Sequence, residues 1–66
     1  MKDFVKRMII ERDELSTKWK ELRDFLYSEK TESLDSENMA LLFTQHKIMG
    51  AYLCILERRI EINNKE

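Results

Sequence analysis

The chain has 66 residues, and its 12 basic and 13 acidic side chains nearly cancel, so no overall field attracts a nucleic-acid polymer or anionic lipid. A domain this small usually needs a disulfide, a metal or a partner to be stable. Cys54 is the only cysteine and His46 the only histidine, which excludes an internal disulfide and leaves no Cys/His set for a metal. We therefore expect a cytoplasmic homo-oligomer that carries no cofactor.

A helix is expected over about residues 2–28, because apolar side chains recur there at the spacing of one helical face. With Val5 at position a of a heptad, Arg12 is the one polar residue among the a and d positions. These positions are Met1, Val5, Met8, Arg12, Leu15, Trp19, Leu22 and Leu26. The chain contains no proline and one glycine, which favours helices over the turn-rich pattern of a sheet protein.

A polar stretch over about residues 29–35 is expected to form a turn, and Asp35 is suited to cap the helix that follows. The second helix is expected over about residues 36–62, and it carries two apolar stripes. The first stripe, which would face the first helix, consists of Met39, Leu42, His46, Met49, Leu53, Leu56 and Ile60. The second stripe consists of Leu41, Ile48, Ile55 and Ile62.

One stripe is enough to cover the other helix of a hairpin, so the second stripe predicts an interface between copies. Gly50 lies in mid-helix, where glycine costs about 1 kcal/mol relative to alanine, and close backbone approach at that interface would offset this cost. The expected fold class is all-α: one domain over residues 1–66, a two-helix antiparallel hairpin that assembles into a helical-bundle homo-oligomer. The turn pairs positions whose numbers sum to about 65, which places Trp19 against His46.

The sequence argues against an enzyme and against a membrane protein. It has a single histidine, no Ser-His-Asp or Cys-His spacing and no glycine-rich phosphate loop. His46 is interpreted first as a packed or hydrogen-bonded core residue rather than as a base. No apolar run approaches the ~20 residues that a membrane span needs, so no membrane partner is expected.

Arg12 and a polar ladder on the second helix are the candidate ligand-binding features. Arg12 either snorkels, pairs with Glu57 or fixes the register, or it points into a cavity that receives an anion, which its planar guanidinium suits. Gln45, Tyr52 and Arg59 are seven residues apart and share one face. An amide, a phenol and a guanidinium in a row either read a base edge, stack on a ring and hold a phosphate, or make hydrogen bonds between subunits.

Two stretches of the sequence carry a family pattern. The second helix contains Leu41-Leu42-x-x-Gln45-x-x-x-Met49-x-x-Tyr52-x-x-Ile55-Leu56-x-x-Arg59-Ile60, and the first half contains Arg7, Glu11, Leu15, Leu22, Phe25, Leu26 and Ser28. Over nearly its whole length the chain resembles very small bacteriophage proteins, helical hairpins related to crAss-like-phage accessory proteins. The resemblance implies phage origin and a role against host defence. In size and class the chain is similar to phage sponges that sequester cyclic nucleotide or cyclic ADP-ribose immune signals.

We therefore expect a non-enzymatic phage anti-defence protein that binds and sequesters a cyclic nucleotide-type immune signal within a homo-oligomer. The ligand-binding residues would be Arg12 and Arg59 for phosphates, Tyr52 and Trp19 for stacking, and Gln45 and His46 for base edges. The interface would contain Leu41, Ile48, Gly50, Ile55 and Ile62. The alternatives are a module that inhibits a host defence protein by docking through the second stripe, and a small structural or assembly part of the phage.

Overall fold

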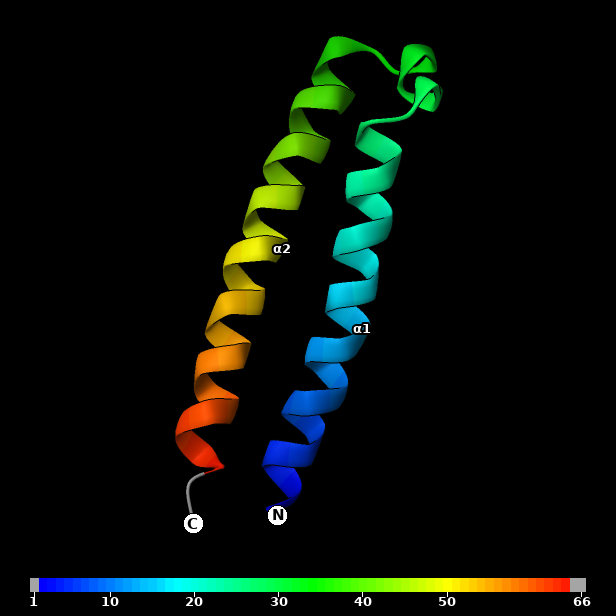
Figure 1. The fold of residues 1–66 in the computed structure, drawn as a ribbon. Coiled ribbons are helices and arrows are strands. Elements are labelled where there is room, and N and C mark those ends of the chain that lie inside the picture. Colours follow the sequence, from blue (N-terminus) through cyan, green and yellow to red (C-terminus); the bar gives the residue numbers. More distant parts are fainter. Residues whose placement is uncertain (1, 65–66) are drawn as a thin grey trace.

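The computed structural model describes residues 2–64, which form one long hairpin (Figure 1). Helix α1 spans Asp3–Leu26, a short 3-10 helix, η1, spans Glu29–Ser33, and α2 spans Ser36–Asn63. The two long helices run antiparallel and side by side, in a rod of 49 × 15 × 14 Å (Figure 1). The expected all-helical fold with two long helices is confirmed, and the described residues contain no strand.

Side-chain caps determine where the helices meet the turn. α1 ends two residues before position 28, because the Ser28 hydroxyl donates to the Phe25 carbonyl (2.7 Å) and accepts from the Lys30 amide (3.3 Å). Ser28 thereby leaves the α-helix and caps η1. Asp35 caps α2 as expected, since its carboxylate accepts a 2.7 Å hydrogen bond from the backbone amide of Asn38.

The hydrophobic core is a narrow seam between α1 and α2. Its buried residues are Val5, Met8, Leu26, Leu53, Leu56 and Ile60. Val5 and Leu56 are fully buried, and they pack with Met8 and Ile60 in one cluster near the open end of the hairpin. No polar or charged residue is buried in the part of the chain that the structure describes. The seam is small, so a lone hairpin gains little of the apolar burial that drives folding.

The second apolar stripe of α2 is exposed in the single hairpin. Its members, Leu41, Ile48, Ile55 and Ile62, are 50–63% exposed. Among the described helices, α2 also has the length and hydropathy of a membrane-spanning helix. The expectation from the sequence rested on an uninterrupted apolar stretch and did not identify α2. Isolated polar residues such as Lys47 interrupt the apolar sequence but lower its mean hydropathy only slightly. α2 therefore has apolar surface on more faces than α1 covers.

Candidate functional site

Trp19 and His46 stack on each other across the hairpin. Their ring centroids lie 4.6 Å apart and their planes differ by 16°, which confirms that these two positions face one another. The indole N–H of Trp19 also donates a 3.2 Å hydrogen bond to the backbone carbonyl of His46. The guanidinium of Arg23, one turn further along α1, lies over the indole at 5.6 Å from its centroid. In the single hairpin, therefore, the ring that was expected to stack on a ligand packs on residues of its own chain.

Gly50 leaves room for this contact. A Cβ atom at position 50 would lie 3.0 Å from Nε1 of Trp19, closer than ordinary van der Waals contact. The close approach expected at Gly50 is thus made by a side chain of the same hairpin, and it accounts for the glycine without a second copy. The stack on Trp19 agrees with the interpretation of His46 as a packed residue. Nε2 of His46 is, however, buried without a hydrogen-bond partner among the described residues, and packing alone does not explain an unsatisfied polar atom.

Tyr52 anchors a second cluster, on the other edge of the seam. Its hydroxyl donates a 2.5 Å hydrogen bond to the carboxylate of Glu11. That bond, with burial and the negative charge of Glu11, raises the pKa of Tyr52 above its ordinary value of 10.0, and the positive charge of Arg59 opposes the rise. Arg59 follows Tyr52 by one heptad and lies on the same face of α2. Gln45, one heptad before Tyr52, is exposed and places its amide nitrogen 3.8 Å from Sδ of Met49.

Arg12 belongs to the edge that carries Trp19. Its guanidinium pairs with the adjacent Asp13 at 3.0 Å, and not with Glu57 across the hairpin, which was one of the alternatives for this residue. Successive residues on a helix point about 100° apart, so Glu11 projects toward Tyr52 while Arg12 projects toward the opposite edge. One hairpin consequently divides the predicted ligand-binding residues into two groups. Gln45, Tyr52 and Arg59 lie on one edge, and Arg12, Trp19 and His46 lie on the other.

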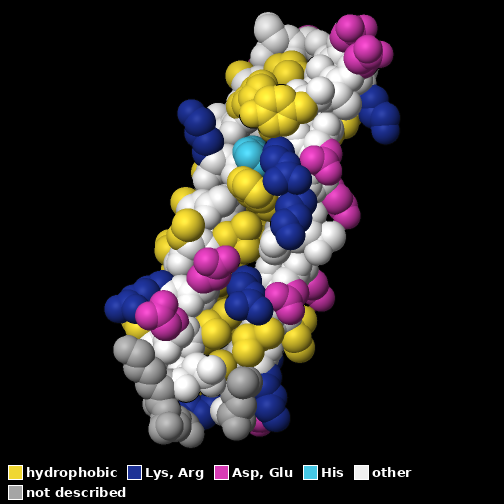
Figure 2. Space-filling view, in the orientation of Figure 1, with side chains coloured by type: hydrophobic (Ala, Val, Ile, Leu, Met, Phe, Trp, Pro, Cys, Tyr) yellow, Lys and Arg dark blue, Asp and Glu magenta, His cyan; other side chains and the backbone are white. Residues whose placement is uncertain are grey.

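A shallow groove with mixed charge lies beside Trp19 and Gly50. Figure 2 shows this face, with the histidine in cyan and Lys and Arg side chains gathered beside it over α1. The groove has a volume of about 250 Å³, and its lining residues are Ser16, Trp19, Lys20, Gly50, Leu53, Cys54 and Glu57. This volume is below the ~300–1,000 Å³ of most small-molecule sites. On this edge, therefore, a single hairpin has no pocket of the size of most small-molecule sites.

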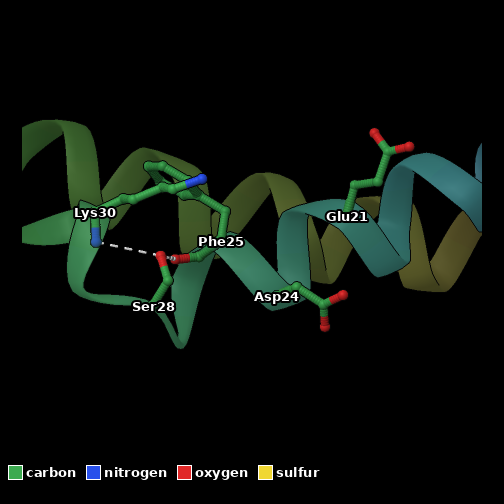
Figure 3. A pocket seen from close by; sticks show the side chains of 5 residues that line it. All are labelled: Glu21, Asp24, Phe25, Ser28 and Lys30. Carbon is green, nitrogen blue, oxygen red and sulfur yellow. Dashed lines mark hydrogen bonds between the residues drawn. The ribbon is translucent and has the colours of Figure 1, made fainter.

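A second hollow lies where α1 meets the turn. Figure 3 shows its lining residues, Glu21, Asp24, Phe25, Ser28 and Lys30, with the hydrogen bond from the Lys30 amide to Ser28 dashed. The hollow has a volume of about 400 Å³ and two carboxylates at its border. Those carboxylates would repel an anion, so this hollow does not suit a phosphate-bearing ligand.

Sequence reasoning missed two residues that organise the clusters, Glu11 and Arg23. In the predicted hairpin, residues that face each other have numbers that sum to about 65. The numbers of Glu11 and Tyr52 sum to 63, so the predicted register could have indicated that these two residues lie close together. Arg23 follows Trp19 by four residues, the spacing at which side chains meet on a helix. Among residues 2–64, no group of three metal-ligating side chains comes together.

The fold defines a small two-helix hairpin in which polar and aromatic side chains form two clusters, one on each edge of the seam. The family model Sequestin matches residues 2–62, and the chain belongs to the Sequestin family. The family name indicates that a molecule is sequestered, which fits the resemblance to small phage sponge proteins. No curated protein and no solved structure matches the chain.

Proposed function

We propose that this chain is a phage anti-defence protein that binds and sequesters a cyclic nucleotide-type immune signal, without converting it, in a homo-oligomer in the host cytoplasm. Membership of the Sequestin family supports sequestration of a molecule. The observation that carries the choice of ligand is the exposed ladder of Gln45, Tyr52 and Arg59, which are spaced seven residues apart and lie on one face of α2. A guanidinium beside a phenol suits a phosphate next to a base or ribose.

The ladder has chemistry for each part of such a ligand. The guanidinium of Arg59 can bind two phosphate oxygens at once. Tyr52 is 38% exposed, so its ring offers a face for stacking while its hydroxyl stays on Glu11. The amide of Gln45 has donor and acceptor atoms for a base edge. Arg12 and Lys20 supply positive charge on the other edge, and they would reach the same ligand only in an assembly of hairpins.

A thermal-shift and calorimetric screen tests the proposal. The probes are cyclic dinucleotides, cyclic trinucleotides and the isomers of cyclic ADP-ribose. A probe that binds only the folded chain adds about 2.7 kcal/mol at a hundred times its dissociation constant. Each kcal/mol moves the unfolding midpoint of so small a domain by roughly 4–8 °C, so a ligand is expected to raise the midpoint by more than about 10 °C.

The adjacent arginines provide a matched pair of variants. Arg59→Ala is expected to weaken binding of the probe at least about tenfold, which corresponds to 1.4 kcal/mol. Arg58→Ala is expected to leave the affinity nearly unchanged, because Arg58 points away from Tyr52 and pairs with Glu61 at 2.8 Å. Equal losses in both variants would indicate general charge rather than a site. The bound probe is expected to be recovered intact by mass spectrometry, and its conversion would contradict a non-enzymatic role.

The exposed stripe on α2 favours one alternative function, a module that inhibits a host defence protein by docking through Leu41, Ile48, Ile55 and Ile62. A screen in which no nucleotide stabilises the chain would favour this alternative over sequestration. The third candidate, a structural or assembly part of the phage, predicts that the chain copurifies with phage particles.

A further inference from the structure

The exposed stripe on α2 repeats every seven residues. Leu41, Ile48, Ile55 and Ile62 follow this spacing over the length of the helix, while an α-helix has 3.6 residues per turn. A strict seven-residue repeat drifts slowly around the helix and packs continuously only against another helix in a left-handed supercoil. α1 cannot be that helix, because it already packs on the buried seam of Leu53, Leu56 and Ile60.

The amount of exposed surface matches one missing partner of ordinary size. The hairpin exposes 5208 Å². A compact monomer of 8.0 kDa would expose roughly 4,450 Å², so the hairpin exposes about 750 Å² more than its mass requires. A standard protein interface buries about 800 Å² on each partner. If one helix buried the stripe, the exposed area of the hairpin would fall to about the area expected for a compact protein of its mass.

We propose that a second copy of this chain covers the stripe, with its own α2 packed antiparallel to the first α2 about a two-fold axis between Ala51 and Tyr52. This axis lies midway between Ile48 and Ile55, so Ile48 of each copy contacts Ile55 of the other. Leu41 likewise meets Ile62 of the second copy. Ala51 at the axis has the small side chain that a close helix crossing needs.

The charges on α2 favour this direction over a parallel pair. A parallel pair would place Lys47, Arg58 and Arg59 each beside its own equivalent, and like charges at such positions are destabilising. In the antiparallel pair, Arg59 lies beside Thr44 and Gln45 of the second copy, which are uncharged. The polar ladder runs along the edge of the stripe, so both copies of the ladder border the interface.

A second copy also completes the ligand site, and this step rests on the proposed function. Glu11 bonds to Tyr52, so Lys18, one heptad after Glu11, lies on the edge that carries Gln45. The two-fold axis adds Arg59 of the second copy to that edge. Each dimer would thus have two equivalent sites, in which one copy supplies Gln45 and Lys18 and the other supplies Arg59. Two cations and an amide suit a phosphate-bearing ligand.

A lipid surface is the rival occupant of the stripe, because α2 has the length and hydropathy of a membrane span. The structure favours a second copy, since α1 lies along the length of α2 and carries charged side chains on its outer face (Figures 1 and 2). A bilayer around α2 would have to accommodate those charges or break the buried seam, and charged side chains are costly inside a bilayer.

Complementary charge variants test the antiparallel dimer. The full chain is expected to sediment at twice 8.0 kDa or at a higher even multiple. Ile48→Glu and Ile55→Lys, each alone, are expected to halve that mass while retaining helical circular dichroism. An equimolar mixture of the two variants is expected to recover it, because Glu at 48 meets Lys at 55 of the other copy. Ile10→Glu is the matched control, since Ile10 is 57% exposed on α1 outside the stripe.

Three results would overturn the inference: no recovery on mixing, an assembly that persists in both single variants, or a wild-type monomer that instead sediments with phosphatidylcholine vesicles. Its failure is distinguishable from failure of the proposed function. If Ile48→Glu monomers bind the nucleotide probe as tightly as the wild-type chain, the two-copy site is wrong and sequestration stands. If the dimer forms as described and no nucleotide binds, the dimer stands and the proposed function fails.

Discussion

Replacing Gly50 with alanine tests whether the glycine serves the Trp19 contact. In an open mid-helix position this change stabilises a protein by about 0.8–1.0 kcal/mol, because alanine is the better helix former. Here the new Cβ would lie 3.0 Å from Nε1 of Trp19, so the indole must move by a few tenths of an ångström. That movement stretches the 3.2 Å hydrogen bond to the His46 carbonyl, which is worth about 0.5–1.5 kcal/mol. The two effects nearly cancel, and Gly50→Ala is expected to leave stability almost unchanged.

A double-mutant cycle separates the two effects. Trp19→Phe removes Nε1, so Gly50→Ala in that background is expected to stabilise the chain by the full ~1 kcal/mol. The coupling between the two changes is then about 1 kcal/mol, or roughly 4–8 °C in the unfolding midpoint. The measurement is urea unfolding of all four proteins at one concentration, because assembly shifts apparent stability. Equal stabilisation by Gly50→Ala in both backgrounds would refute the reasoning.

Two further predictions follow from single contacts. Glu11→Gln is expected to lower the pKa of Tyr52 toward 10.0, because the raised value comes first from its hydrogen bond to Glu11. Phenolate absorbance of the variant and of the wild-type chain, followed over pH, measures this change. In the wild-type chain the protonated Tyr52 hydroxyl stabilises the fold below pH 10.0, because its pKa is higher in the folded chain than in the unfolded chain. This stabilisation is lost as the pH rises through the pKa of Tyr52 in the folded chain. Asp35→Ala is expected to cost about 1 kcal/mol in urea unfolding, whereas Asp35→Ser keeps an oxygen for the Asn38 amide and should cost much less.

The two long helices could be predicted from the sequence because their evidence is local. Apolar spacing, the absence of proline and the capping position of Asp35 each depend on residues within a few turns of one another. The contact of Trp19 with His46 could also be predicted, because one short turn sets the register of the whole hairpin. α1 ends two residues before the expected boundary of about residue 28, because the hydroxyl of Ser28 competes for backbone groups in a way that apolar spacing does not reveal.

The arrangement of the candidate site depended on tertiary structure. The sequence placed Arg12 on the seam and Tyr52 beside it, yet small rotations of each helix about its axis decide which edge a flanking residue occupies. Packing of Val5 and Leu56 sets those rotations, and it turns Tyr52 toward Glu11 on one edge and Arg12 toward the other. Gly50 likewise acquired its explanation only when the indole of Trp19 was seen against it. Sequence periodicity by itself determined which residues share a face, and tertiary packing decided which neighbour each face meets, because that choice depends on contacts between residues far apart in the chain.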